Sequence, residues 1–109
     1  MDRTKRYADI LTQVLREETS VQPSLQPGLK IVSSCDRETG QFLLIIIGWD
    51  RDDWHHSILF HAQIVDSKVI IEADMTEGLK PLLLEAGIPE EDFLSDQDRD
   101  QLEFEQIAA

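Results

Sequence analysis

Apolar side chains near the start of the chain recur with the period of an α-helix. Tyr7, Ile10, Leu11, Val14 and Leu15 follow spacings of three and four residues, which places them on one side of a helix. This pattern predicts an amphipathic helix over residues 2–18. The segment that follows, residues 19–28, is rich in Ser, Pro and Gly and is therefore predicted to be a loop.

A period of two replaces the helical period after this loop. A short strand is predicted over Leu29–Cys35, and residues 36–40 form a turn that ends with a glycine. Residues 41–49 are the strongest predicted strand, because apolar side chains fill both faces. One face holds Phe42, Leu44 and Ile46, and the other holds Leu43, Ile45 and Ile47. A strand that is apolar on both faces is typical of a central strand covered on both sides.

Residues 54–65 alternate between apolar and polar positions and predict a further strand. The alternation places Ile58, Phe60, Ala62 and Ile64 on one face. A two-residue hairpin loop at Asp66-Ser67 would join this strand to the next one, and counting outward from the loop predicts the register. The predicted opposite pairs are Ile64 with Val69, Ala62 with Ile71, Phe60 with Ala73 and His61 with Glu72.

The chain after the sheet predicts short helices. Residues 79–86 fit a helix with Pro81 in its first turn, and Gly87 ends it. Pro89 and the acids that follow it predict another helical turn. Residues 95–109 fit either a strand or a helix, and we favour a helical or irregular tail. The predicted fold is therefore a single α+β domain over residues 1–109, with an N-terminal helix, an antiparallel meander of three to four strands and short C-terminal helices.

Charge and size narrow the class of partner. The 109 residues include 22 Asp and Glu against 10 Lys and Arg, a formal net charge of −12. Such a chain repels phosphate, which makes direct DNA binding doubtful and favours basic protein partners. A domain this small leaves apolar surface uncovered, so the second sheet face with Leu43, Ile45, Ile47 and Leu59 predicts a homo-oligomer.

Two further features concern the compartment. The single cysteine, Cys35, excludes an internal disulfide and fits a reducing cytoplasm. The longest apolar run, residues 42–47, is too short to cross a membrane.

Few residues are arranged as a catalytic or ligand site would need. The predicted opposition of His61 and Glu72 would place an imidazole beside a carboxylate, yet catalysis would also need a cleft and a third group, so we favour a structural pair. Asp74, Thr76 and Glu77 fit a capping box or, as we prefer, an Asx-type corner. Trp49 is expected to pack in a core or an interface. No residue spacing predicts a metal site or a phosphate loop, so no cofactor is expected.

The order of several short motifs resembles the XisI family. These motifs are Gly48-Trp49-Asp50, the strand that contains His61, the hairpin of residues 64–71, the corner at Asp74, Thr76 and Glu77, and the segment of residues 84–92. The resemblance covers about residues 1–93, and it implies a small α+β protein with an antiparallel sheet that forms oligomers. The chain departs from the family at Ser67, where Gly is common, and at Ile70, where Trp is common.

XisI proteins are fdxN element excision controlling factors, found mainly in cyanobacteria. The resemblance implies a non-enzymatic, cytoplasmic regulator of DNA excision during heterocyst differentiation that contacts an XisH-like, nuclease-related protein. Two alternatives stay open: a DNA-binding specificity factor, and a small enzyme that uses His61, Glu72 and Asp74. The candidate interaction or structural residues are Trp49, His61, Glu72, Asp74, Thr76 and Glu77.

Overall fold

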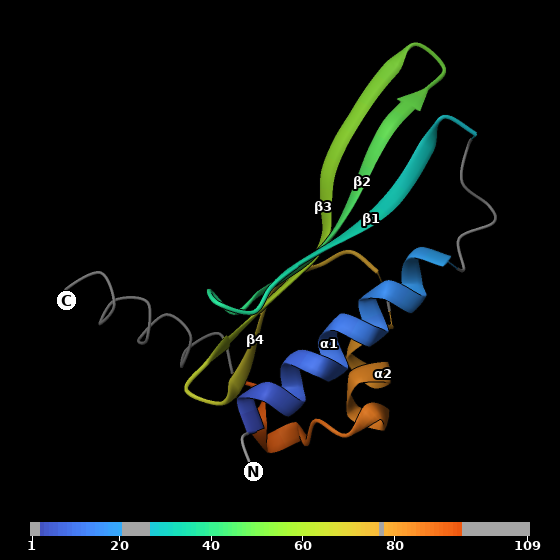
Figure 1. Ribbon diagram of the computed structural model, residues 1–109. Helices are drawn as coiled ribbons and strands as arrows, with labels where there is room; N and C mark the ends of the chain where they lie inside the picture. Colours follow the sequence, from blue (N-terminus) through green and yellow to red (C-terminus); the bar gives the residue numbers. More distant parts are fainter. Residues whose placement is uncertain (1–2, 21–26, 77, 95–109) are drawn as a thin grey trace.

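The computed structural model describes residues 3–20, 27–76 and 78–94. Its elements are helix α1 (Arg3–Ser20), strands β1 (Leu29–Asp36), β2 (Gln41–Asp50), β3 (Asp53–Val65) and β4 (Lys68–Asp74), helix α2 (Leu79–Ala86) and the 3-10 turn η1 (Glu90–Asp92). The strands form one antiparallel sheet in the order β1-β2-β3-β4. Both helices lie on one side of this sheet, and β1, β2 and β3 continue beyond the helices as an arm (Figure 1). The predicted α+β meander is confirmed.

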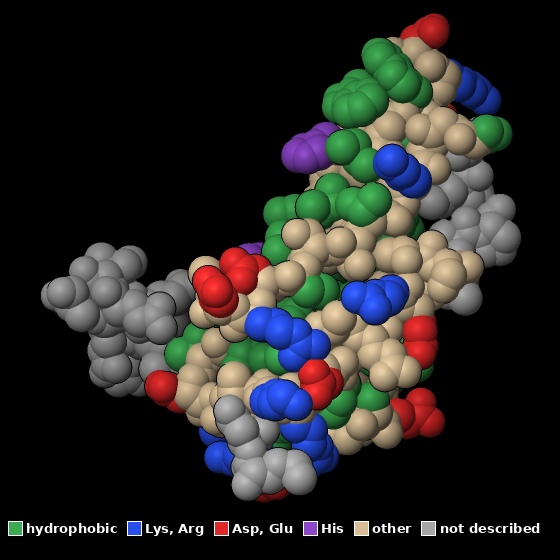
Figure 2. Space-filling view, in the orientation of Figure 1, with side chains coloured by type: hydrophobic (Ala, Val, Ile, Leu, Met, Phe, Trp, Pro, Cys, Tyr) green, Lys and Arg blue, Asp and Glu red, His purple; other side chains and the backbone are tan. Residues whose placement is uncertain are grey.

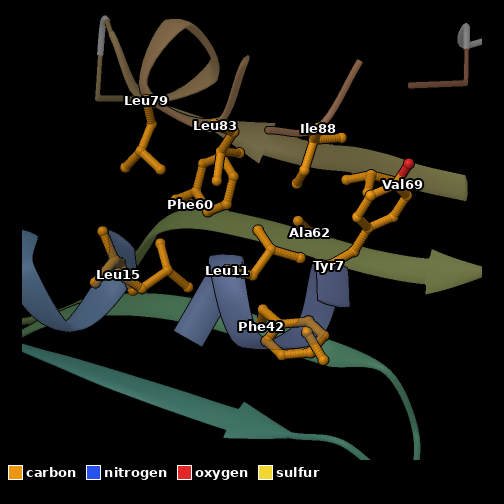
Figure 3. Packing of buried hydrophobic residues seen from close by; sticks show 12 residues of the cluster. Tyr7, Leu11, Leu15, Phe42, Phe60, Ala62, Val69, Leu79, Leu83 and Ile88 are labelled. Carbon is orange, nitrogen blue, oxygen red and sulfur yellow. The ribbon is translucent and has the colours of Figure 1, made fainter. Parts of the chain in front are cut away.

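The core lies between the two helices and the sheet face that they cover. Figure 3 shows side chains of α1, the sheet and α2 pointing toward one another. The buried residues of this cluster are Tyr7, Ala8, Leu11 and Leu15 of α1, Phe42, Leu44, Phe60, Ala62 and Val69 of the sheet, Leu79 and Leu83 of α2, and Ile88. The helical period of α1 and the alternation along β2 thus converge on one shared layer.

The predicted element boundaries hold to within about two residues, the usual precision of such assignments. Helix α1 continues past the predicted end to Ser20, and the hydroxyls of Thr19 and Ser20 donate to carbonyl oxygens one turn earlier. Helix α2 has the predicted bounds, and Gly87, at φ 123°, ends it as expected. The tail predicted for residues 95–109 lies outside the described residues, as does most of the predicted loop before β1.

The prediction that β2 is covered on both sides is wrong for the described part of the chain. Both helices pack on the face that carries Phe42 and Leu44, which are buried. On the other face Leu43, Ile45 and Ile47 are only partly buried. An apolar sheet face therefore lies beside solvent along the arm.

Two β-bulges change the register that strict alternation predicts. In β3 Leu59 is an extra residue, so that Phe60 lies opposite Leu44 while Ile58 lies opposite Ile45. Because one added residue reverses which way the following side chains point, Ile58 leaves the face of Phe60. The prediction that both share a face is wrong.

The second bulge lies in β4 at Glu72. The predicted pairs near the hairpin loop are confirmed, since Ile64 lies opposite Val69 and Ala62 opposite Ile71. Beyond the bulge, His61 lies opposite Ala73, and Phe60 lies opposite Asp74. The predicted pairs of His61 with Glu72 and of Phe60 with Ala73 are therefore wrong.

The hairpin loop at Asp66-Ser67 is confirmed as a two-residue loop. Val65 pairs with Lys68, and Asp66 and Ser67 have φ values of 53° and 60°. Positive φ at both central residues is the property of a type I′ turn, whose twist matches the strands that it joins.

Candidate interaction surfaces

The first candidate surface is the arm face turned away from the helices. It is here called the tryptophan face and is defined by Lys30, Val32, Leu43, Ile45, Ile47, Trp49, Trp54, His56 and Ile58. The exposed fractions of Trp49, Trp54 and Ile58 are 54%, 55% and 46%. The two indoles meet edge to face with their centroids 5.3 Å apart. Hydrophobic side chains gather over this arm in Figure 2.

A groove of about 360 Å³ adjoins the indoles. It is lined by Pro27, Gly28, Leu29, Lys30, Ile47, Gly48, Trp49 and Trp54. The backbones of β1 and β2 approach closely here, and the Trp49 N–H donates to the Gly28 carbonyl at 2.9 Å. A Cβ atom on Gly48 would lie 2.1 Å from that carbonyl oxygen, and Gly48 has φ 133°. This side of the groove therefore requires glycine.

A hydrogen-bonded chain of polar side chains crosses the sheet beside the tryptophan face. His61 Nε2 lies 2.6 Å from Gln41 Oε1, and Gln41 Nε2 donates to Gln63 Oε1 at 3.1 Å. Gln63 Nε2 donates in turn to Glu72 Oε2 at 2.5 Å. The structure thus brings His61 and Glu72 into one network through two glutamines. This network joins three strands, as a structural element of the sheet would.

The corner after β4 is an Asx-type turn, the alternative that the sequence favoured. Asp74 Oδ1 accepts hydrogen bonds from the Thr76 N–H at 2.9 Å and from the Thr76 hydroxyl at 2.5 Å. Helix α2 begins only at Leu79, with Gly78 at its N-cap, so Asp74 does not cap it. Glu77 lies outside the described residues.

The buried carboxylate of Asp92 is the centre of a cluster of polar side chains, and no local sequence pattern predicts this cluster. The Tyr7 hydroxyl donates to Asp92 Oδ2, Arg3 Nη1 lies 3.4 Å from the same oxygen, and Lys68 Nζ donates to Oδ1 at 2.9 Å. The hydrogen bonds from Tyr7 and Lys68 lower the pKa of Asp92. Burial, followed by the bond to Asp92, raises the pKa of Tyr7. The cluster fastens η1 to α1 and β4.

The second candidate surface is a groove along the seam between the two helices, here called the α1–α2 groove. It encloses about 340 Å³ and is lined by Val14, Glu17, Glu18, Leu82, Glu85 and Ala86. A neighbouring hollow of about 290 Å³ shares Val14, Glu17 and Ala86 and extends the groove toward Ile10. Three carboxylates thus surround an apolar floor on which Leu82 is 40% exposed. This combination is complementary to a basic, amphipathic segment of another protein.

Other kinds of site were also sought. Within residues 3–20, 27–76 and 78–94, no three His, Cys, Asp or Glu side chains converge so as to hold a metal ion. None of the helices in those ranges has the length and apolarity needed to span a membrane.

Comparison with known proteins identifies relatives of the chain. The family model described as XisI protein matches residues 1–105. No curated protein sequence matches this chain. Among solved structures, the fdxN element excision controlling factor XisI from Anabaena variabilis ATCC 29413 superposes with a TM-score of 0.71 at 25% identity, covering 86% of this chain and 91% of that one. A XisI-like protein from the same organism gives a TM-score of 0.76 at 19% identity, covering 84% of each chain. The latter similarity concerns the fold alone.

Proposed function

Because the chain belongs to the XisI family, we propose that it is a non-enzymatic regulatory factor that controls site-specific excision of a DNA element by contacting an XisH-like, nuclease-related partner. The family match over residues 1–105 carries this proposal. The structure that is 25% identical supports it, because that protein is an fdxN element excision controlling factor. In this proposal the protein acts in the cytoplasm of a cyanobacterium during heterocyst differentiation, while a separate recombinase cuts and rejoins the DNA.

The charge of the chain supports a protein partner over bare DNA. A net charge of −12 opposes the approach of a phosphate backbone. The same charge attracts a protein with a basic DNA-binding face and speeds its association. An acidic regulator seated on such a face would compete directly with DNA for it.

We place the contact at the α1–α2 groove. Glu17, Glu18 and Glu85 supply the negative rim, and exposed Leu82 supplies an apolar anchor point. A basic helix could lay its apolar side on this floor while its Lys and Arg side chains reach the carboxylates.

The test is the affinity of the purified chain for the XisH-like protein, measured by calorimetry at about 50 mM and about 500 mM salt. The affinity should fall at the higher salt concentration, because exposed charge pairs weaken as salt rises. Glu85→Lys should weaken binding by about 10-fold, the scale of losing a favourable rim charge and adding a repulsive one. Asp52→Lys makes the same charge change at the arm tip and serves as the matched control. Equal effects of the two substitutions would refute the groove assignment, and no complex at low salt would refute the partner.

The alternative functions predict different results with the same protein. A DNA-binding specificity factor would shift labelled element-border DNA in a gel at physiological salt without the partner. An enzyme that uses His61, Glu72 and Asp74 would lose turnover in His61→Gln while keeping its melting temperature.

A further inference from the structure

The tryptophan face carries three large exposed apolar side chains that the proposed partner contact leaves unused. Trp49, Trp54 and Ile58 are each about half exposed, and both helices lie on the other side of the sheet. Large exposed side chains grouped on one face are typical of an interaction surface. We propose that this face is the contact between two copies of the chain, which pair as a two-fold symmetric dimer.

The distribution of charge identifies the occupant. None of the residues that define the tryptophan face is acidic, although the whole chain has 22 acids and 10 bases. Its polar members are Lys30 and His56. A basic partner would therefore find no carboxylate to pair with here, and a second copy would likewise bring no carboxylates into the contact.

The carboxylates that end β2 and begin β3, Asp50 and Asp53, also leave this face clear. Trp49 and Asp50 are neighbours in β2 and so point to opposite faces of the sheet. Asp50 lies 3.8 Å from His55 Nε2, and His55 pairs with Gly48 on the face away from the indoles. Two copies can thus approach through the tryptophan face while Asp50 and its strand partner Asp53 stay outside the contact.

The size and composition of the face suit a dimer. A half-exposed indole presents about 100 Å², given the roughly 150–250 Å² that an aromatic side chain can bury. Trp49 and Trp54 would then supply about a quarter of the roughly 800 Å² that a standard interface buries on each partner. Ile58 and the partly exposed Val32, Leu43, Ile45 and Ile47 enlarge this apolar centre. Tryptophan is also among the residues that dominate binding energy at interfaces.

Intrinsic fluorescence tests the proposal directly, because the chain has two tryptophans and both lie on this face. At about 100 µM, an interface of standard size is populated. Light scattering of the full chain at that concentration should therefore give twice the mass of the 12.5 kDa chain. Dilution should then shift the emission to longer wavelength and increase quenching by acrylamide, as the indoles return to water. A single-chain mass at about 100 µM would overturn the proposal.

Substitutions separate this face from the groove. Ile58→Asp places a carboxylate in the contact and should raise the dimer dissociation constant at least about 100-fold, as an unpaired buried charge does at an interface. Leu82→Asp adds the same charge on α2 and should leave the dimer intact while weakening the binding of the XisH-like protein. Circular dichroism checks that each variant is folded, and Trp54→Ser is the second variant if Ile58→Asp does not fold.

Two results would refute the assignment of this face. One is a folded Ile58→Asp or Trp54→Ser variant that remains as dimeric as the original chain. The other is a Leu82→Asp variant that dissociates as much as Ile58→Asp. Failure of the partner contact alone would leave the dimer standing, because the two surfaces lie on opposite faces of the sheet.

Discussion

Phe60 and Ile58 lie two residues apart in β3, yet the bulge at Leu59 places them on opposite faces of the sheet. Phe60 is fully buried against α1 and α2, so Phe60→Ala should lower the free energy of unfolding by about 3–5 kcal/mol. Ile58 is 46% exposed, and Ile58→Ala should cost under about 1 kcal/mol in a single copy. Against a typical total of about 5–15 kcal/mol, the first loss is large and the second is small.

Urea unfolding followed by circular dichroism measures both variants at about 1 µM and about 100 µM protein, because stability gained from pairing of copies grows with concentration. The cost of Phe60→Ala should be similar at the two concentrations, whereas the cost of Ile58→Ala should rise if the tryptophan face pairs. If Phe60→Ala does not fold, Phe60→Leu gives the comparison. A loss of about 3 kcal/mol or more for Ile58→Ala at both concentrations would mean that Ile58 belongs to the core, and the bulge would be refuted.

Three further substitutions or reactions test other parts of the structure. Because Asp92 has a lowered pKa, its contribution to stability is complete above about pH 4 and is lost as pH falls through the lowered pKa. Asp92→Asn should therefore flatten the acid side of the profile of melting temperature against pH. Equally steep profiles for the variant and the original chain would contradict this. Gly48→Ala should cost at least about 1–3 kcal/mol from strain and contact with Gly28, whereas Gly78→Ala, with open space around its Cβ, should stay within about 0.5 kcal/mol in the same urea titration. Burial raises the pKa of Cys35, so iodoacetamide at about pH 8 should label the native chain several-fold more slowly than the urea-unfolded chain, and equal rates would refute this.

The elements were predictable because each has a strong local pattern. The apolar period of Tyr7, Leu11 and Leu15 predicts α1, and Pro81 with Gly87 predicts the position of α2. The register between β3 and β4 was predictable only from the hairpin loop to the bulge at Glu72. A bulge adds one residue to a strand without changing its apolar composition, so alternation alone gives no sign that Leu59 or Glu72 is extra.

The candidate surfaces were less predictable because they depend on residues far apart in the chain. The Asp92 cluster joins residues that are 85 and 24 positions away, Tyr7 and Lys68, and in the sequence Asp92 is simply the last of three consecutive acids. The α1–α2 groove likewise combines Glu17 with Glu85. The sequence singled out Trp49, but the exposure of Trp49 and Trp54 follows from the arm extending beyond both helices, where Asp53–Ile58 are exposed on both faces (Figure 1).

The two proposed contacts have a joint consequence that neither has alone. If copies pair through the tryptophan face, the α1–α2 groove of each copy lies on the outer side of the dimer, because the helices pack against Phe42 and Leu44 while the register places both indoles on the opposite face. The dimer would then hold two partner molecules, and partners that are themselves paired would bind with added avidity. Light scattering of the complex should give two copies of each protein, and Ile58→Asp should reduce this to one of each with unchanged affinity per site. A complex with a single copy of each protein, formed at concentrations where the original chain alone is dimeric, would show that pairing and partner binding exclude each other, and the opposed arrangement of the two surfaces would be wrong.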